Sequence, residues 1–332
     1  MINPFTGNAF SLMALSTAIN KVPNKYNRLG ELGIFRPIPI TKVQFAAEEI
    51  VGVLNMLNSV PRGGVAPKNT VGKRQLRNFT VPHYPLEDVV LPDDAQGVRA
   101  FGTENTDETI AGVLMMKMAA MRDKFDITRE YLRMGALKGL VVDPDQTTIY
   151  NYFTEFGVVK KTIDFATDVD TTDVNAKCRE VINWIEDNLK GESVNGYRAL
   201  VSQTFYDSLV KHPLVRESYK YFQTTQQLSN DLSKQFTFAG ITFEPYRATC
   251  TDPAGVSRAF IADNYGYIIP LGASCFAEVI APGTFMEAVN VPGLPYYAKT
   301  EPRAFGMGLD IHAQMNVLPI CVRPELIVEI TI

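Results

Sequence analysis

The feature of this sequence that most constrains its fold is an uninterrupted helical pattern from Gly102 to Gly139. No proline lies inside it, Thr106 is a candidate N-cap, and Gly139 is placed to end the helix. Apolar residues recur along it at roughly helical spacing: Ile110, Leu114, Met121, Phe125 and Leu132. About 30 residues at about 1.5 Å each give a rod some 45 Å long, which few compact domains need. Taken alone, the pattern is compatible with a helix buried in a core and with a long helix that supports the rest of the fold.

Composition and charge narrow the class of protein. The 332 residues are enough for roughly two domains, and 46% of them are apolar. A net charge of −4 argues against a dedicated nucleic-acid binder, and no apolar run approaches the roughly 20 residues of a membrane helix. The first residues carry no basic segment ahead of an apolar one, so no signal peptide is expected. Four widely spaced cysteines are expected to be reduced, buried thiols of a cytosolic protein: Cys178, Cys250, Cys275 and Cys321.

The segment ahead of the long helix has an unusual charge pattern. Residues 1–34 read as an extended arm, and residues 35–91 as two strand-like runs around a turn-rich tip. No carboxylate lies between Ile50 and Leu86. That stretch nevertheless carries five cations: Arg62, Lys68, Lys73, Arg74 and Arg77. Because a lone two-stranded hairpin is marginal in water, we expect this basic hairpin to have an acidic partner.

A candidate partner follows directly in the sequence. The segment from Glu87 to Glu108 contains seven carboxylates and a single cation, Arg99. Three of the carboxylates lie at the start of the helix: Glu104, Asp107 and Glu108. The hairpin could fold back onto its own helix or lie across the helix of a neighbouring copy. Exposed ion pairs contribute only about 0–1 kcal/mol each, but several together could set the register between subunits.

The rest of the chain alternates between β and α/β patterns. Strands are expected at residues 140–142, 147–153 and 158–165, followed by an α/β unit over residues 171–300. That unit should contain helices at 172–189 and 204–211 and a hairpin around Gly240. Residues 308–322 form one long strand pattern, and the closing run RPELIVEITI should pair with the strands after the long helix. The α/β unit then reads as an insertion into the domain of the long helix.

The sequence offers little catalytic chemistry. Its three histidines lack partners at metal-ligand spacing, and phosphate-binding and nucleophile motifs are missing. Residues 168–179 resemble a calcium loop but carry Asp173 and Arg179 where glycine and glutamate are required, so a helix cap is favoured. Cys178 reads as packing rather than as a nucleophile, and phosphate contacts by residues 62–77 are a minor alternative. We therefore expect no enzyme activity, no cofactor and no metal.

The order of these parts resembles a known family. The matching stretches are PHYPLEDVVLPDD before the helix, YLRMGALKG at its end, SKQFTFAGITFEPYRA, AFIADNYGYIIPLGA and the ending VRPELIVEITI. Together they resemble the major capsid proteins of tailed double-stranded DNA phages, and more closely the lambda-type major capsid protein E family. The resemblance implies an α+β fold of the Hong Kong 97 type, covering nearly the whole chain.

The resemblance also implies an organisation and partners. Residues 1–34 would be the N-terminal arm and 35–91 the extended loop. Residues 92–166 and 303–332 would form a peripheral domain with the spine helix, and 167–302 the axial domain. Copies would form pentamers and hexamers of an icosahedral head around non-specifically held DNA, assembled in the bacterial cytoplasm. A separate scaffolding protein and a portal would take part, a decoration protein is left open, and no membrane is involved. The alternatives are an encapsulin-type compartment and a soluble two-domain α/β enzyme.

Overall fold

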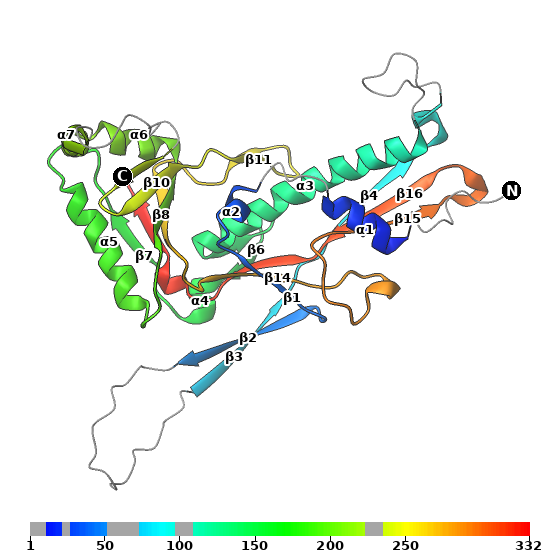
Figure 1. Ribbon diagram of the computed structural model, residues 1–332, viewed down its shortest axis with the longest axis horizontal. Coiled ribbons are helices and arrows are strands. Elements are labelled where there is room, and N and C mark those ends of the chain that lie inside the picture. Colours follow the sequence, from blue (N-terminus) through cyan, green and yellow to red (C-terminus); the bar gives the residue numbers. More distant parts are fainter. Residues whose placement is uncertain (1–10, 22–26, 52–72, 97–108, 223–234) are drawn as a thin grey trace, which may run out of the picture. The chain divides into compact units, whose positions relative to one another are not determined.

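A computed structural model describes residues 11–21, 27–51, 73–96, 109–222 and 235–332 (Figure 1). The chain divides into two compact units, each assembled from segments that are far apart in the sequence. The first unit comprises Met1–Phe45, Phe79–Leu132 and Ala277–Ile320. The second comprises Ala46–Asn78, Arg133–Phe276 and Cys321–Ile332. No helix among the described residues is long and apolar enough to cross a membrane.

The long helix is confirmed as α3, Ile110–Lys138, with 29 residues and a length of about 43 Å. The hydroxyl of Thr109 accepts a hydrogen bond from the Gly112 amide at 3.1 Å and so caps its first turn. The predicted cap, Thr106, lies outside the described residues. Gly139 ends the helix as predicted, in the left-handed conformation at φ 76°.

An antiparallel sheet of three strands lies at the centre of the first unit. It is ordered β15 (Tyr297–Pro302), β16 (Leu309–Met315) and β4 (Tyr84–Val90). Helix α1 (Leu12–Lys21) packs on β15, where the Ser16 hydroxyl accepts a hydrogen bond from the Ala298 amide. The predicted extended arm is therefore wrong for this stretch. Its helix forms because Leu12, Leu15 and Ile19 share a face that is buried in the unit.

A second small sheet is ordered β1 (Arg36–Pro39), β14 (Phe276–Ile280) and β17 (Val317–Cys321), with β1 parallel to β14. The single strand predicted over residues 308–322 is therefore wrong, because β16 and β17 belong to different sheets. Asn316 separates them, with its backbone oxygen accepting from the Ala281 amide and its side-chain amide donating to the Pro282 carbonyl. These bonds hold the chain where it passes from one sheet to the other.

The second unit is built on a sheet of six strands. Their order is β7 (Lys161–Asp164), β18 (Val328–Thr331), β13 (Tyr265–Leu271), β8 (Gly196–Val201), β10 (Ile241–Pro245) and β9 (Phe236–Phe238). The closing strand β18 pairs with β7, as expected for the strands after the long helix, but its other neighbour is β13. The end of the chain thus completes the sheet of the α/β segment, a pairing that the sequence pattern did not predict.

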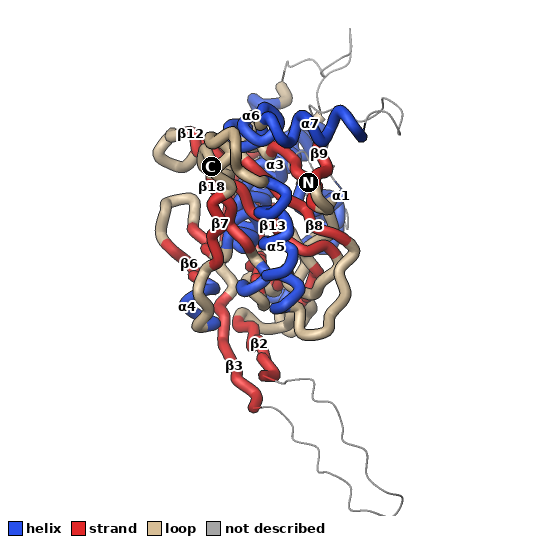
Figure 2. The backbone as a smooth tube through the Cα atoms, turned by 90° about the vertical axis from the view of Figure 1, so that its left-hand side faces the viewer, coloured by secondary structure: helices blue, strands red, loops and turns tan. Residues whose placement is uncertain are grey.

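Helix α5 (Val174–Asn188) lies across one face of this sheet (Figure 2). The Asp173 side chain accepts a hydrogen bond from the Ala176 amide, so the cap favoured over a calcium loop is confirmed. The hairpin around Gly240 is confirmed as β9 and β10. Helix α6 (Gln203–Lys211) is also confirmed, whereas α7 (Pro213–Phe222) was not predicted from the sequence. Proline is well suited to the first turn of a helix.

The remaining elements are short. They are α2 (Arg28–Glu31), β2 (Gln44–Val51), β3 (Lys73–Thr80), β5 (Leu140–Val142), β6 (Thr148–Asn151), α4 (Tyr152–Phe156), β11 (Thr249–Thr251) and β12 (Ser257–Ala259), with 3-10 turns at Pro92–Asp94, Met286–Ala288, Ala304–Gly306 and Pro324–Leu326. The predicted hairpin after the long helix is confirmed as β5 and β6, although its last residues belong to α4.

Candidate inter-subunit contact sites

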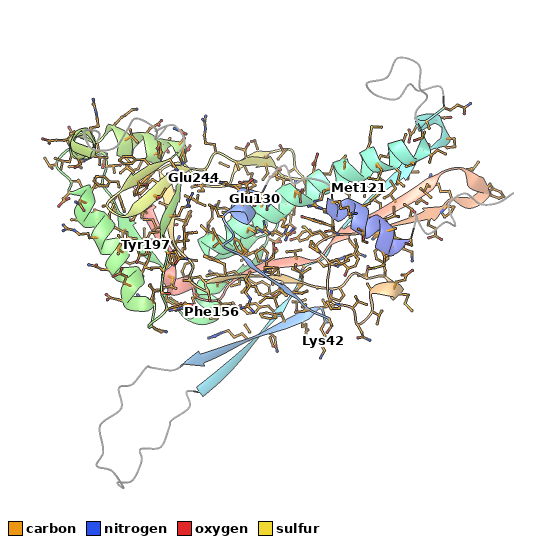
Figure 3. All side chains as sticks on the ribbon, viewed as in Figure 1. Lys42, Met121, Glu130, Phe156, Tyr197 and Glu244 are labelled. Carbon is orange, nitrogen blue, oxygen red and sulfur yellow. The ribbon has the colours of Figure 1, made fainter. Side chains whose placement is uncertain are left out.

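The basic hairpin predicted from the charge pattern exists as the β2–β3 pair. Within the part of the chain that the structure describes, this sheet has two strands and no third. At its base, residues 41–44 are exposed, with Val43 at 56% exposure and Lys42 pointing away from the strands in Figure 3. A two-stranded ribbon gains little stability alone, although Phe79 at the base of β3 is fully buried.

The eight predicted contact residues are only partly placed. Arg62, Lys68, Glu104, Asp107 and Glu108 lie outside the described residues, whereas Lys73 and Arg74 lie in β3 without described side chains. Arg77 is the member with a described side chain. The contact of these residues with a neighbouring copy stays a prediction.

Arg77 makes contacts inside its own chain. Its Nε donates to the Glu155 carbonyl at 2.7 Å, and its guanidinium lies 4.7 Å from the centre of the Phe156 ring. Phe156 belongs to α4 and is labelled in Figure 3. Arg77 therefore fixes the base of β3 to α4 and differs in this respect from a cation held free for a partner.

Part of the acidic segment ahead of the long helix is also paired within its chain. The Lys117 ammonium lies 2.7 Å from the Asp94 carboxylate and 3.9 Å from that of Asp88, and it donates to the Val89 carbonyl. The hydrogen bond from Lys117 lowers the pKa of Asp94. His312 contacts Glu87 at 3.0 Å. The charge count missed these partners because Lys117 follows the acidic segment and His312 lies far along the chain.

A cluster of buried charged groups lies on the face of α3 that the first unit covers. Arg122 Nε donates to Asp126 Oδ1 at 2.8 Å, and the Tyr296 hydroxyl donates to the same oxygen at 2.6 Å. The Arg122 guanidinium also stacks over the Tyr296 ring at 4.0 Å. Burial raises the pKa of Tyr296 to about 12, with the Asp126 carboxylate acting in the same direction and the arginines opposing it. Tyr296 is therefore a neutral hydrogen-bond donor at physiological pH.

The cluster extends to the second small sheet. Arg129 Nε donates to Glu278 Oε1 at 2.8 Å, a second guanidinium nitrogen contacts Oε2, and the third lies 3.2 Å from the Tyr296 hydroxyl. Burial alone would lower the pKa of Arg129, but the ion pair with Glu278 outweighs burial and raises it. Arg129 therefore keeps its charge in this bidentate contact.

Side chains on the same face of α3 form hydrogen bonds with the backbone of the N-terminal segment. Arg122 donates to the Ile19 carbonyl at 2.7 Å, and Glu130 Oε1 accepts from the Leu29 amide at 2.7 Å. Figure 3 labels Glu130 on α3. The sequence analysis missed this cluster. Its signal was four charged side chains at helical spacing on an otherwise apolar face: Arg122, Asp126, Arg129 and Glu130.

The arrangement positions chain segments and offers no reactive group. Among the described residues, no cluster of three or more histidine, cysteine, aspartate or glutamate side chains could hold a metal ion. Burial raises the pKa of the Cys178 and Cys275 thiols to about 12, which keeps both protonated and unreactive.

Comparison with known proteins gives a consistent result. The sequence profile of the family described as phage major capsid protein E matches residues 11–332. The chain is 31% identical to the major capsid protein of Salmonella phage Felix O1, over 97% of this chain and 96% of that one. It is 28% identical to the major capsid protein of Pseudomonas phage KPP10, over 98% of both.

Solved structures share the fold at low sequence identity. A candidate capsid protein of a prophage of Escherichia coli CFT073 matches with a TM-score of 0.61 at 11% identity, over 97% of this chain and 98% of that one. The mature capsid of bacteriophage PhiM1 matches with a TM-score of 0.52 at 13% identity, over 93% and 87%. The predicted fold class, an α+β fold of the Hong Kong 97 type, is confirmed. The phage capsid interpretation is favoured over an encapsulin-type compartment and over a two-domain enzyme.

Proposed function

Because this chain belongs to the phage major capsid protein E family, we propose that it is the repeating subunit of an icosahedral phage head. Copies form pentamers and hexamers that close into a shell around double-stranded DNA. The subunit has a structural role and catalyses no reaction. The observation that carries this proposal is the match to the phage capsid family along residues 11–332.

We assign the family's named parts to this chain as the sequence suggests. Residues 1–34 are the N-terminal arm and 35–91 the extended loop. Residues 92–166 and 303–332 form the peripheral domain and residues 167–302 the axial domain, with β7 and β18 of the former segments completing the six-stranded sheet of the latter. The β2–β3 ribbon supports an extended loop, because a sheet of two strands is marginally stable alone and needs a surface to lie on.

The extended loop meets its neighbour through charge. Arg62, Lys68, Lys73 and Arg74 contact the start of the spine helix of the next copy, around Glu104, Asp107 and Glu108. Arg77 was placed in this set from the sequence. Its contacts with Glu155 and Phe156 support an additional role in fixing the ribbon to its own chain.

Other partners follow from this role. A separate scaffolding protein and a portal take part in assembly inside the bacterial cytoplasm. A net charge of −4 favours confinement of the packaged DNA over tight binding to it.

Negative-stain electron microscopy of the purified protein, alone and with its scaffolding protein, tests the proposal. Shells or hexameric rings are expected. Discrete dimers or tetramers under all conditions would contradict it and favour the enzyme.

The charge contact needs a separate test that leaves Arg77 in place. The triple variant Arg62→Glu, Lys68→Glu, Arg74→Glu should stay folded but assemble poorly, because it reverses the basic ribbon. Lys211→Glu, an exposed lysine at the end of α6, is the matched control and should assemble normally. Normal particles from the triple variant would show that charge does not guide this contact.

A further inference from the structure

The turn that joins β15 to β16 presents two apolar side chains to solvent. Phe305 is 97% exposed and Met307 is 65% exposed. The turn lies at the outer end of the β15–β16 hairpin, at the right of Figure 1. An aromatic side chain normally contributes to stability by burial, and no packing among the residues that the structure describes accounts for Phe305.

The backbone of this turn is strained as well as exposed. Phe305 has φ 63° and ψ 11°, the left-handed conformation that glycine adopts readily and that a bulky side chain disfavours. Such strain persists only where the surrounding structure imposes it, and it marks positions with a function. A glycine at 305 would suit the fold of the single chain better than the phenylalanine that is present.

The surrounding turn is well braced. The Arg303 amide donates to the Gly308 carbonyl at 2.9 Å, the Gly306 amide donates to the Arg303 carbonyl at 3.1 Å, and Arg303 Nε contacts Asp310 Oδ1 at 2.7 Å. The turn therefore holds the backbone that carries its apolar side chains in a defined conformation before any contact forms. Preorganisation of this kind lowers the entropic cost of binding.

Charge indicates which partner such a turn can meet. The chain carries a net charge of −4, so two copies repel each other on average. Near the turn, Arg303 pairs with Asp310 and Lys299 pairs with Glu287 at 2.6 Å. These ion pairs cancel the charge beside the apolar tip, so two copies that both carry a net negative charge can touch there with little repulsion. A positively charged partner would be attracted without such cancellation.

We infer that the turn of residues 303–308 is a contact between copies of this chain, in which Phe305 and Met307 are buried on a second copy. The inference rests on the proposed shell function and names one of the contacts that build the shell. Phenylalanine and methionine are both enriched at the buried centres of protein interfaces. Each copy would contribute one such anchor.

A fluorescent reporter at position 305 tests the contact directly. The wild-type chain has a single tryptophan, Trp184, whose indole donates to the Glu325 carbonyl. The variant Phe305→Trp adds a second indole, and its signal is the difference from wild type. On assembly, the emission of the added indole should shift to the blue and its quenching by acrylamide should fall several-fold.

A second set of variants tests the energetic role. Phe305→Gly relieves the strain, so the unassembled subunit should unfold at the same or a higher urea concentration than wild type. The same variant should raise the subunit concentration needed for assembly by roughly tenfold or more, because the buried ring is lost. Phe305→Leu keeps an apolar anchor and should restore most of the assembly.

The outcomes separate the two proposals. If the wild-type protein never forms shells, the proposed function fails and this contact with it. If shells form while the added indole stays open to acrylamide, or while Phe305→Gly assembles like wild type, the inference is wrong and the shell function stands. Protection of the indole by another phage protein in the absence of shells would also overturn it.

Discussion

Arg129 and Glu278 form a bidentate ion pair inside the first unit. Arg129 Nε lies 2.8 Å from Glu278 Oε1, and a second guanidinium nitrogen contacts Oε2. The side chains are only 13% and 2% exposed, respectively. The pair joins α3 to β14 across 149 residues of sequence. A long helix that must hold its position in a shell is thus fixed by charge as well as by apolar packing.

Breaking this pair should destabilise the subunit strongly. Glu278→Gln leaves the buried Arg129 charge without its counter-ion, and we expect the free energy of unfolding to fall by about 3 kcal/mol. Urea unfolding of the unassembled subunit measures it. Glu287→Gln is the matched control: it removes the exposed pair with Lys299 and should cost less than about 1 kcal/mol. Equal effects of the two variants would show that the Arg129–Glu278 pair is solvated.

Gly293 should tolerate no side chain. A Cβ at this position would lie 2.3 Å from the Ile280 carbonyl oxygen and 2.5 Å from that of Ala281, and the Gly293 amide donates to the Ile40 carbonyl. Because the obstructing atoms are backbone, Gly293→Ala should lower the free energy of unfolding by at least about 2 kcal/mol. Gly255 has φ 82° with open space around it, so Gly255→Ala carries only backbone strain of about 1 kcal/mol. A smaller loss at Gly293 than at Gly255 would contradict the close approach.

Local signals predicted the long elements and the turns. The helix end at Gly139, the cap at Asp173 and the hairpin around Gly240 each depend on residues within one turn of chain, so the sequence carries them directly. Helix α1 was not predicted because its ten residues are too few to show a sustained helical pattern of apolar residues. Its stability comes from contacts with α3 and β15. A short helix of this kind depends on tertiary packing more than on propensity.

Long-range partners could not be predicted. Strands β16 and β17 have the same apolar pattern, and nothing in that pattern states that they belong to different sheets. The charged face of α3 was visible as Arg122 followed by Asp126, whereas Glu278 and Tyr296 are more than a hundred residues away. The charge count likewise identified the acidic segment without its partner Lys117. Pairing between distant segments depends on the fold, which residue patterns alone did not specify.

Thiol labelling should distinguish Cys250 from the other cysteines. Cys178, Cys275 and Cys321 are completely buried, whereas Cys250 on β11 is half-buried. Burial raises the pKa of all four thiols. We expect Ellman's reagent to modify Cys250 slowly in the native subunit and the other three only after unfolding. Rapid reaction of two or more thiols in the native state would contradict the packing of α5 and β17. Cys250→Ser should abolish the native-state reaction.

Lys138, at the end of α3, should make stability depend on pH. Burial lowers the pKa of Lys138 to about 8, partly opposed by the Glu329 carboxylate and aided by the Lys160 ammonium. The ammonium also lies 5.9 Å from the centre of the Tyr267 ring. Between pH 8 and the ordinary lysine value near 10.4, the unfolded chain binds this proton and the folded chain does not. Stability contributed by this group therefore rises with pH across that window and is absent below it.

Lys138→Met removes the cost of burying the charge and keeps the length of the side chain. At pH 7 the variant should be more stable than wild type by up to about 3 kcal/mol, the equivalent of its lowered pKa. That advantage should shrink as the pH is raised from 8 to 10.5, because removing the proton of unfolded wild-type Lys138 costs less free energy as the pH approaches the ordinary lysine pKa near 10.4. Urea unfolding of both proteins across this range measures the difference, which cancels other groups that titrate there. Lys211→Met, at an exposed position, should show no such trend. An advantage that stays constant to pH 10.5 would mean that Lys138 keeps its proton in the folded subunit.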